Sequence, residues 1–192
     1  MKRKVEAKKT KIRDFFTIPN ILCYIRFALI PLFVYLYINA ESTRDYYMAA
    51  AVILISGLTD FADGFIARKF NQITEVGKFI DPLADKLTQA ALILTLMFKI
   101  KWMEILVVIF IIKEAFMAIN GAVLLVKKGV KLDGAMWFGK VSTAVFYAVM
   151  FILILLPGLS TVWVNILMGI TGFFLILSFA MYIPVFMQMY KK

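Results

Sequence analysis

The sequence predicts an all-α, polytopic membrane protein with six transmembrane helices and a short interfacial helix before them. Of its 192 residues, 62% are hydrophobic and only 18% are charged, which is too apolar for an ordinary soluble domain. The apolar residues fall into runs of about 20, the length of a helix that crosses a bilayer. Only short polar connections separate these runs, so we expect a single membrane domain.

The first predicted element is the basic segment 1–17. Seven cations precede the first apolar run, namely Lys2, Arg3, Lys4, Lys8, Lys9, Lys11 and Arg13. Apolar residues alternate with them from Val5 to Phe16, and this mixture suits a short helix lying in the cytoplasmic interface against anionic headgroups. A disordered basic tail is the alternative.

Residues 18–192 form the predicted six-helix transmembrane domain. Its spans are expected at residues 18–38, 46–67, 79–98, 102–126, 135–156 and 161–188. Pro31 and Pro184 fall inside the first and last spans. They predict a local kink or a broken helix, which a membrane bundle tolerates when neighbouring groups satisfy the freed backbone.

The orientation follows from the distribution of lysine and arginine over the connections. One side of the membrane would carry the N-terminal segment together with Arg68, Lys69, Lys78, Lys127, Lys128, Lys131, Lys191 and Lys192, and the other only Arg44, Lys99 and Lys101. The richer side is expected to be cytoplasmic, with both termini and the connection between the second and third spans. Membrane topology thus explains the net charge of +10, and nucleic-acid binding is not expected.

The residue types present restrict the chemistry that is possible. The sequence has no histidine and a single cysteine, Cys23, which excludes imidazole bases, Ser-His-Asp triads and an intrachain disulfide. Carboxylates, lysines, tyrosines and hydroxyl groups remain. A metal bound by such groups is expected to be a hard cation held by oxygen atoms.

Two acidic pairs flank the connection between the second and third spans. Asp60 and Asp63 lie three residues apart, and Asp81 and Asp85 lie four apart. On helices, each pair projects from one face, so two helical arms can bring the four carboxylates together. Carboxylates at a membrane boundary need neutralisation, and two divalent ions, Mg²⁺ or Mn²⁺, would supply it while leaving coordination sites for a diphosphate.

Small residues and an arginine accompany the aspartates. Gly64, Ala67 and Gly77 would let a planar base or another helix approach the backbone closely, and ordinary helix packing is the alternative interpretation of each alone. Arg68 can offer a two-pronged guanidinium to a phosphate.

The pattern Asp-x2-Asp-Gly-x2-Ala-Arg-x8-Gly-x3-Asp-x3-Asp resembles the signature of the CDP-alcohol phosphotransferase family at every fixed position. The matching residues are Asp60, Asp63, Gly64, Ala67, Arg68, Gly77, Asp81 and Asp85. A second stretch, Pro19-Asn20 followed by Arg26, is similar to the opening of bacterial phosphatidylglycerophosphate synthases, although Cys23 replaces the usual hydroxyl residue.

The resemblance implies roles for these residues. Asp60, Asp63, Asp81 and Asp85 would be metal ligands, and Asp85 would also deprotonate the acceptor hydroxyl. The CDP site would consist of Asp60, Asp63, Gly64, Ala67, Arg68, Gly77 and Asp81. An alcohol would attack the lipid-linked phosphate of CDP-diacylglycerol and expel CMP, in a homodimeric enzyme of a bacterial cell membrane whose active site is cytoplasmic.

The acceptor would be recognised by cations outside the signature. Lys113, Lys140 and Lys131 are the candidates, and they favour glycerol 3-phosphate as the acceptor. Ser142 stands where the resembling synthases carry a second lysine, so a cardiolipin synthase that uses phosphatidylglycerol is the main alternative. For Lys113, internal pairing with Glu114 is an equal alternative.

Three further interpretations remain open but less favoured. Phosphatidylserine and phosphatidylinositol synthases share the signature, but their acceptor patterns are not evident. A cation transporter would spread its acids along several helices rather than confine them to one connection. An intramembrane prenyltransferase usually separates its two acidic motifs widely.

Overall fold

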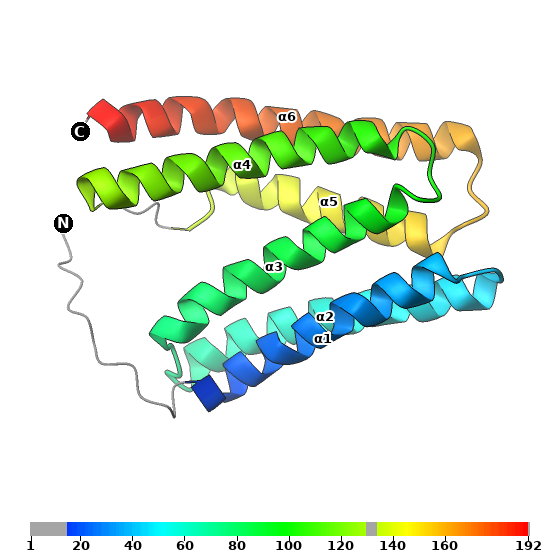
Figure 1. Ribbon diagram of the computed structural model, residues 1–192, viewed down its shortest axis with the longest axis horizontal. Coiled ribbons are helices and arrows are strands. Elements are labelled where there is room, and N and C mark those ends of the chain that lie inside the picture. Colours follow the sequence, from blue (N-terminus) through cyan, green and yellow to red (C-terminus); the bar gives the residue numbers. More distant parts are fainter. Residues whose placement is uncertain (1–14, 130–133, 192) are drawn as a thin grey trace. The chain divides into compact units, whose positions relative to one another are not determined.

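The computed structural model describes residues 15–129 and 134–191, which form six helices and no strand (Figure 1). The helices are α1 (Ile18–Ile38), α2 (Thr43–Lys69), α3 (Glu75–Leu96), α4 (Met103–Lys128), α5 (Trp137–Leu155) and α6 (Thr161–Lys191). The predicted all-α fold with six long helices is confirmed. The predicted interfacial helix falls almost entirely outside the described residues, as does Lys131.

Five of the six helices are long and apolar enough to cross a membrane, and α3 is the exception. Glu75, Lys78, Asp81, Asp85 and Lys86 lie between its start and its middle, and these charges lower its hydropathy. The composition of the other five makes the chain an integral membrane protein. Helices α1 and α6 continue through Pro31 and Pro184, so neither is broken there.

The described residues up to 91 form one compact unit, in which α1 and α2 pack side by side (Figure 1). A capping box starts α2, because the Ser42 hydroxyl accepts from the Asp45 N–H and the Asp45 carboxylate accepts from the Ser42 N–H at 2.9 Å. Phe33 and Tyr37 on α1 are buried, and the Tyr37 ring meets the Tyr46 ring of α2 edge to face at 5.5 Å. These contacts fix α1 against α2.

The described residues from 92 onward form a second unit, in which α4 and α5 each pack against α6. Leu124, Phe138, Tyr182 and Phe186 form a buried cluster here. A Cβ atom on Gly139 would overlap the Tyr182 hydroxyl, so α5 approaches α6 closely because that position carries no side chain. Gly129 ends α4 with φ of 62°, the left-handed conformation that glycine adopts readily.

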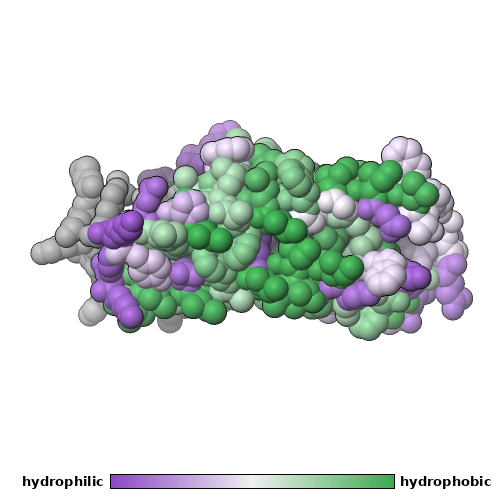
Figure 2. Space-filling view, turned by 90° about the horizontal axis from the view of Figure 1, so that it is seen from above, coloured by the Kyte–Doolittle hydropathy of each residue, from purple (hydrophilic) through white to green (hydrophobic). Residues whose placement is uncertain are grey.

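Large apolar side chains remain exposed along the helices, among them Leu58, Ile111, Val126, Trp163 and Phe173. Figure 2 shows hydrophobic residues over the middle of the face in view and hydrophilic residues gathered toward its ends. Exposed apolar patches of this kind are unusual on soluble monomers. Such exposure is expected of helices that lie in a bilayer, where lipid tails can cover apolar side chains.

Candidate active site

The acidic pairs lie on the two helices that flank one short connection. Asp60 and Asp63 stand in the last three turns of α2, and Asp81 and Asp85 stand in the first half of α3. The chain reverses between them through Asn71, whose φ is 52°, and the N–H of Gln72 donates to the Ala67 carbonyl at 3.0 Å. The tight turn brings the acidic segments of the two helices together.

Arg26 of α1 joins three of the four aspartates. Its Nη1 atom lies 2.7 Å from Oδ1 of Asp60 and 3.4 Å from Oδ1 of Asp81, and its Nη2 atom contacts Oδ2 of Asp63. The arginine side chain is 2% exposed and that of Asp63 5%, whereas Asp60 and Asp81 are about half exposed. One buried guanidinium therefore holds carboxylates from α2 and α3 against α1.

Helix α1 contributes three polar side chains to the site. Asn20, Cys23 and Arg26 are spaced by three residues, so they share one helical face, and all three are buried. The Cys23 thiol donates to Oδ2 of Asp63 at a distance of 3.4 Å. The cysteine thus contacts the acidic cluster, which the sequence had not indicated.

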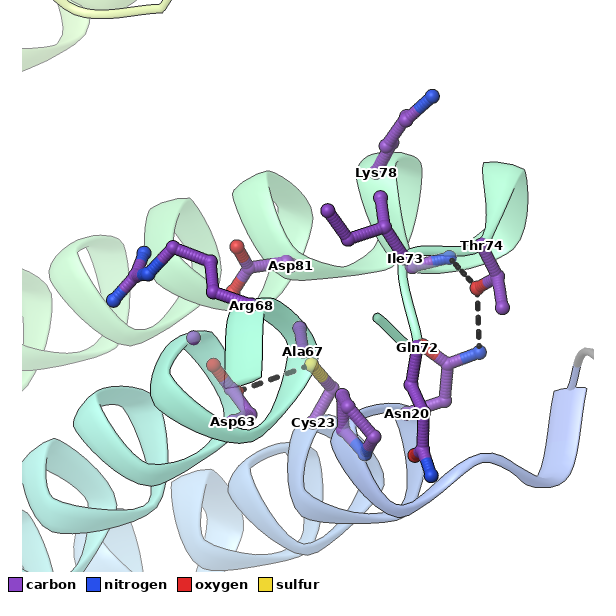
Figure 3. A pocket seen from close by; sticks show the side chains of 13 residues that line it. Asn20, Cys23, Asp63, Ala67, Arg68, Gln72, Ile73, Thr74, Lys78 and Asp81 are labelled. Atoms are coloured by element: carbon purple, nitrogen blue, oxygen red, sulfur yellow. Dashed lines mark hydrogen bonds between the residues drawn. The ribbon is translucent and has the colours of Figure 1, made fainter. Parts of the chain in front are cut away.

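A cavity of about 210 Å³ opens beside this cluster (Figure 3). Its walls contain six of the residues predicted to bind CDP, namely Asp63, Gly64, Ala67, Arg68, Gly77 and Asp81. Asp60, the seventh, is not in the wall but meets the cluster through Arg26. The Arg68 side chain folds back over Gly64. Its Nη1 would lie only 3.5 Å from a Cβ atom placed on that glycine.

A second polar contact fixes the start of α3 at the edge of the cavity. The Thr74 hydroxyl accepts from the Gly77 N–H at 2.9 Å and from Nδ2 of Asn20 at 3.2 Å (Figure 3). Thr74 thus caps the first turn of α3, and Asn20 ties that cap to α1. A Cβ atom on Gly77 would lie only 2.7 Å from Oδ1 of Asn20, so the close approach requires glycine.

Asp85 has different surroundings from the other three aspartates. Its Oδ2 accepts from Nε2 of Gln89 at 3.0 Å, and Oε1 of Gln89 accepts from Lys86 at 3.2 Å. Gln89 is 2% exposed, so packing restricts its amide. Asp85 remains close enough to Asp60 for their charges to interact.

The residues present fit a divalent metal of the hard class. Carboxylate oxygens of Asp63 and Asp81 and the Cys23 sulfur all lie within 4.8 Å of one another. The oxygen atoms are the ligands that Mg²⁺ and Mn²⁺ prefer. The cluster also carries more negative charge than Arg26 can neutralise, which favours cation binding.

The three lysines predicted to bind the acceptor belong to the second unit or fall outside the described residues. Lys113 is buried and its Nζ lies 2.6 Å from Oε1 of Glu114, as the internal-pairing alternative required. Lys140 is exposed on α5, and Lys131 is not described. Their role in acceptor binding stays a prediction.

Several residues that line the cavity had not been predicted to belong to the CDP site. Gln72, Ile73, Thr74 and Lys78 line it together with Pro19. Thr74 carried a recognisable signal, since a threonine directly before a helix is a favoured N-cap. Asn20 and Arg26 matched the family opening, but the pattern alone did not show which side chains they contact.

Comparison with known sequences shows which class of protein has this fold and site. Residues 16–187 match the sequence profile of the family described as CDP-alcohol phosphatidyltransferase. The chain therefore belongs to this family, as its aspartate signature had indicated.

Individual relatives carry two kinds of enzyme name. A Bacillus subtilis CDP-diacylglycerol–glycerol-3-phosphate 3-phosphatidyltransferase is 37% identical over 142 residues, which cover 67% of this chain and 71% of the relative. A putative cardiolipin synthase of Mycobacterium tuberculosis is 32% identical over 172 residues, covering 88% and 79%. A Streptomyces coelicolor cardiolipin synthase (CMP-forming) is 37% identical over 107 residues, covering 54% of this chain and about half (48%) of the relative.

Proposed function

We propose that this protein transfers a phosphatidyl group from CDP-diacylglycerol to glycerol 3-phosphate and releases CMP. The observation that carries the proposal is the convergence of Asp60, Asp63 and Asp81 on one guanidinium beside a cavity lined by Gly64, Ala67 and Gly77. Family membership and the Bacillus relative support the same reaction.

In the proposed mechanism, Asp85 accepts the proton of the acceptor hydroxyl. The hydroxyl oxygen bonds to the lipid-linked phosphorus while the bond from that phosphorus to the bridging oxygen breaks, and CMP leaves with that oxygen. Gln89 orients the Asp85 carboxylate through its amide hydrogen bond.

The remaining residues bind and orient the donor. Gly64, Ala67 and Gly77 leave room for the cytidine against the backbone, and Arg68 can form a charge-assisted pair with a phosphate. Two divalent ions, Mg²⁺ or Mn²⁺ held by Asp60, Asp63, Asp81 and Asp85, would polarise the diphosphate and stabilise the leaving group.

The proposal extends to location and assembly. The lysine and arginine asymmetry of the sequence supports a cytoplasmic active site in a bacterial cell membrane, with membrane lipids around the apolar helices. The resemblance to the family supports a homodimer. Family membership disfavours the cation transporter and the prenyltransferase.

A cardiolipin synthase is the second candidate function. The mycobacterial and Streptomyces relatives carry that name, and Ser142, buried on α5, replaces a lysine that would favour a phosphorylated acceptor. Phosphatidylglycerol would then take the place of glycerol 3-phosphate, with the same donor chemistry.

An acceptor screen tests both candidates. Purified protein in mixed micelles receives CDP-diacylglycerol, Mg²⁺ or Mn²⁺ and either acceptor, and CMP release is measured alongside product masses. We expect phosphatidylglycerophosphate with glycerol 3-phosphate. Cardiolipin formed only from phosphatidylglycerol would select the second candidate, and no CMP release with either acceptor would reject both.

The substitution Asp85→Asn tests the assigned base. Because an amide cannot accept the hydroxyl proton, we expect turnover to fall by at least about a hundredfold. Asp45→Asn is the matched control, since Asp45 lies at the opposite end of α2 in the capping box and should keep most activity. Full activity in Asp85→Asn would refute the assignment.

A further inference from the structure

Arg26 is a buried cation at the centre of the acidic site, and the proposed reaction gives it no step. We propose that Arg26 is the resident counter-ion of the site: it holds the aspartates together before metal binds, and it opposes metal binding through its charge. This inference rests on the proposed function, which assigns these aspartates as metal ligands.

The contacts of Arg26 are directed almost wholly to the carboxylates. Both terminal nitrogens meet aspartate oxygens, from Asp60 and Asp63 on α2 and from Asp81 on α3. Its Nε is buried and has no hydrogen-bond partner among the described residues. If the main role of Arg26 were to bind the backbone of neighbouring helices, its Nε–H would be expected to donate a hydrogen bond as well.

Burial explains why such a cation is needed before metal arrives. Asp63 is buried, and a buried carboxylate without a partner is strongly destabilising. Repulsion between Asp60, Asp63 and Asp81 would also separate α2 from α3. The guanidinium offsets both effects because its planar fork can reach several carboxylates at once.

The same charge works against a divalent ion. Arg26 occupies oxygen atoms that a metal would use, and its positive charge lies within contact distance of the ligands. One guanidinium neutralises only one carboxylate charge, so the cluster still attracts metal, but less strongly than it would without Arg26. The proposal therefore predicts tighter metal binding when Arg26 is removed. If Arg26 only positioned the ligands, its removal would weaken metal binding.

Mn²⁺ binding to the purified full chain in detergent separates these two roles. Free Mn²⁺ is followed by electron paramagnetic resonance, and thermal unfolding is measured with and without Mn²⁺. For Arg26→Gln we expect the Mn²⁺ dissociation constant to fall by about tenfold or more. We also expect a lower unfolding temperature without metal and a larger increase on adding Mn²⁺ than in the wild type.

Two further variants complete the test. Arg26→Lys keeps the charge but loses the fork, so its Mn²⁺ affinity should stay near that of the wild type while its metal-free unfolding temperature falls. Lys69→Gln removes a cation that packs over the Phe65 ring, with no change in Mn²⁺ affinity expected.

The outcomes distinguish the inference from the function on which it rests. Equal or weaker Mn²⁺ binding by Arg26→Gln, with normal binding by the wild type, would overturn the counter-ion role alone. A wild type that binds no Mn²⁺ would overturn the metal site as well. If Arg26→Gln cannot be isolated even with Mn²⁺, Arg26→Lys decides: an unfolding temperature equal to that of the wild type without metal would contradict the proposal.

Discussion

Asp85 and Asp63 have different surroundings within one site. Asp63 is buried against the Arg26 guanidinium, whereas Asp85 accepts from the neutral amide of Gln89. The Gln89 amide restricts the orientation of the Asp85 carboxylate. An oriented carboxylate suits the proposed role of Asp85 as the proton acceptor.

At the residue scale, the Gln89 amide offers a direct test of this difference. Gln89→Leu keeps the volume but removes the donor to Asp85, so we expect kcat to fall about tenfold to a hundredfold, as for other residues that orient a ligand. The KM for CDP-diacylglycerol should change little. Steady-state kinetics with varied donor concentration measures both quantities.

Thr88→Val is the control for that substitution. Thr88 is also buried, and its hydroxyl donates to the Ala84 carbonyl within α3, so its loss should leave kcat within about twofold of the wild type if only Asp85 orientation matters. Equal losses in the two variants would mean that general packing of α3, rather than orientation of Asp85, explains the effect.

At the scale of elements, α3 differs from its neighbours because its first half serves the site. Charged residues there lower its hydropathy below that of the five apolar helices. Its beginning is fixed by polar contacts instead, through the Thr74 hydroxyl and the Asn20 amide. The position of Asp81 therefore depends on the close approach of α1 to Gly77.

The substitution Gly77→Ala tests that approach. The added Cβ would lie 2.7 Å from the buried Asn20 amide oxygen and 3.0 Å from the Thr74 hydroxyl, so the cap must shift. We expect loss of most activity and a lower unfolding temperature, with overpacking costing about 1–3 kcal/mol. CMP release and thermal unfolding measure the two effects.

Gly57→Ala provides the comparison within α2. Apart from its chain neighbours and the nearby backbone of α2, no described residue has an atom within 4 Å of a Cβ placed there, and alanine favours a helix over glycine by up to about 1 kcal/mol. We expect unchanged activity and an equal or higher unfolding temperature. A Gly77→Ala protein that behaves like Gly57→Ala would show that the contact with Asn20 is dispensable.

At the scale of the whole molecule, five apolar helices with exposed hydrophobic side chains define a membrane protein. Which side faces the cytoplasm is a separate question, and the distribution of lysine and arginine answers it only as a prediction. The connections between helices carry the orientation signal, because the apolar helices would fit the membrane in either orientation.

Labelling in intact bacteria tests the orientation. Lys101→Cys follows α3 and Lys191→Cys ends α6, and both positions are exposed. With a membrane-impermeant thiol reagent we expect labelling of Lys101→Cys only. The wild type supplies the background, since Cys23 is 2% exposed. Labelling of Lys191→Cys only would place the acidic site on the extracellular side of the membrane.

Much of the fold could be predicted because helix length and hydropathy are local properties. The predicted boundaries 18–38 agree with α1, and the others differ by a few residues at their ends. The predicted span 79–98 became a longer and more polar helix, since α3 begins at Glu75 and includes the charged turn. Apolar content finds the bilayer-crossing part of a helix, but its cap determines where the helix starts.

The sequence by itself determined the family, through eight residues at fixed spacing, and the membrane class, through composition. Only the tertiary structure decided that Arg26 and Cys23 of α1 meet aspartates of α2 and α3, and that Asn20 meets the Thr74 hydroxyl just before α3. The reason is physical: residue spacing along one helix fixes which side chains share a face, but the partner of that face depends on how separate helices pack.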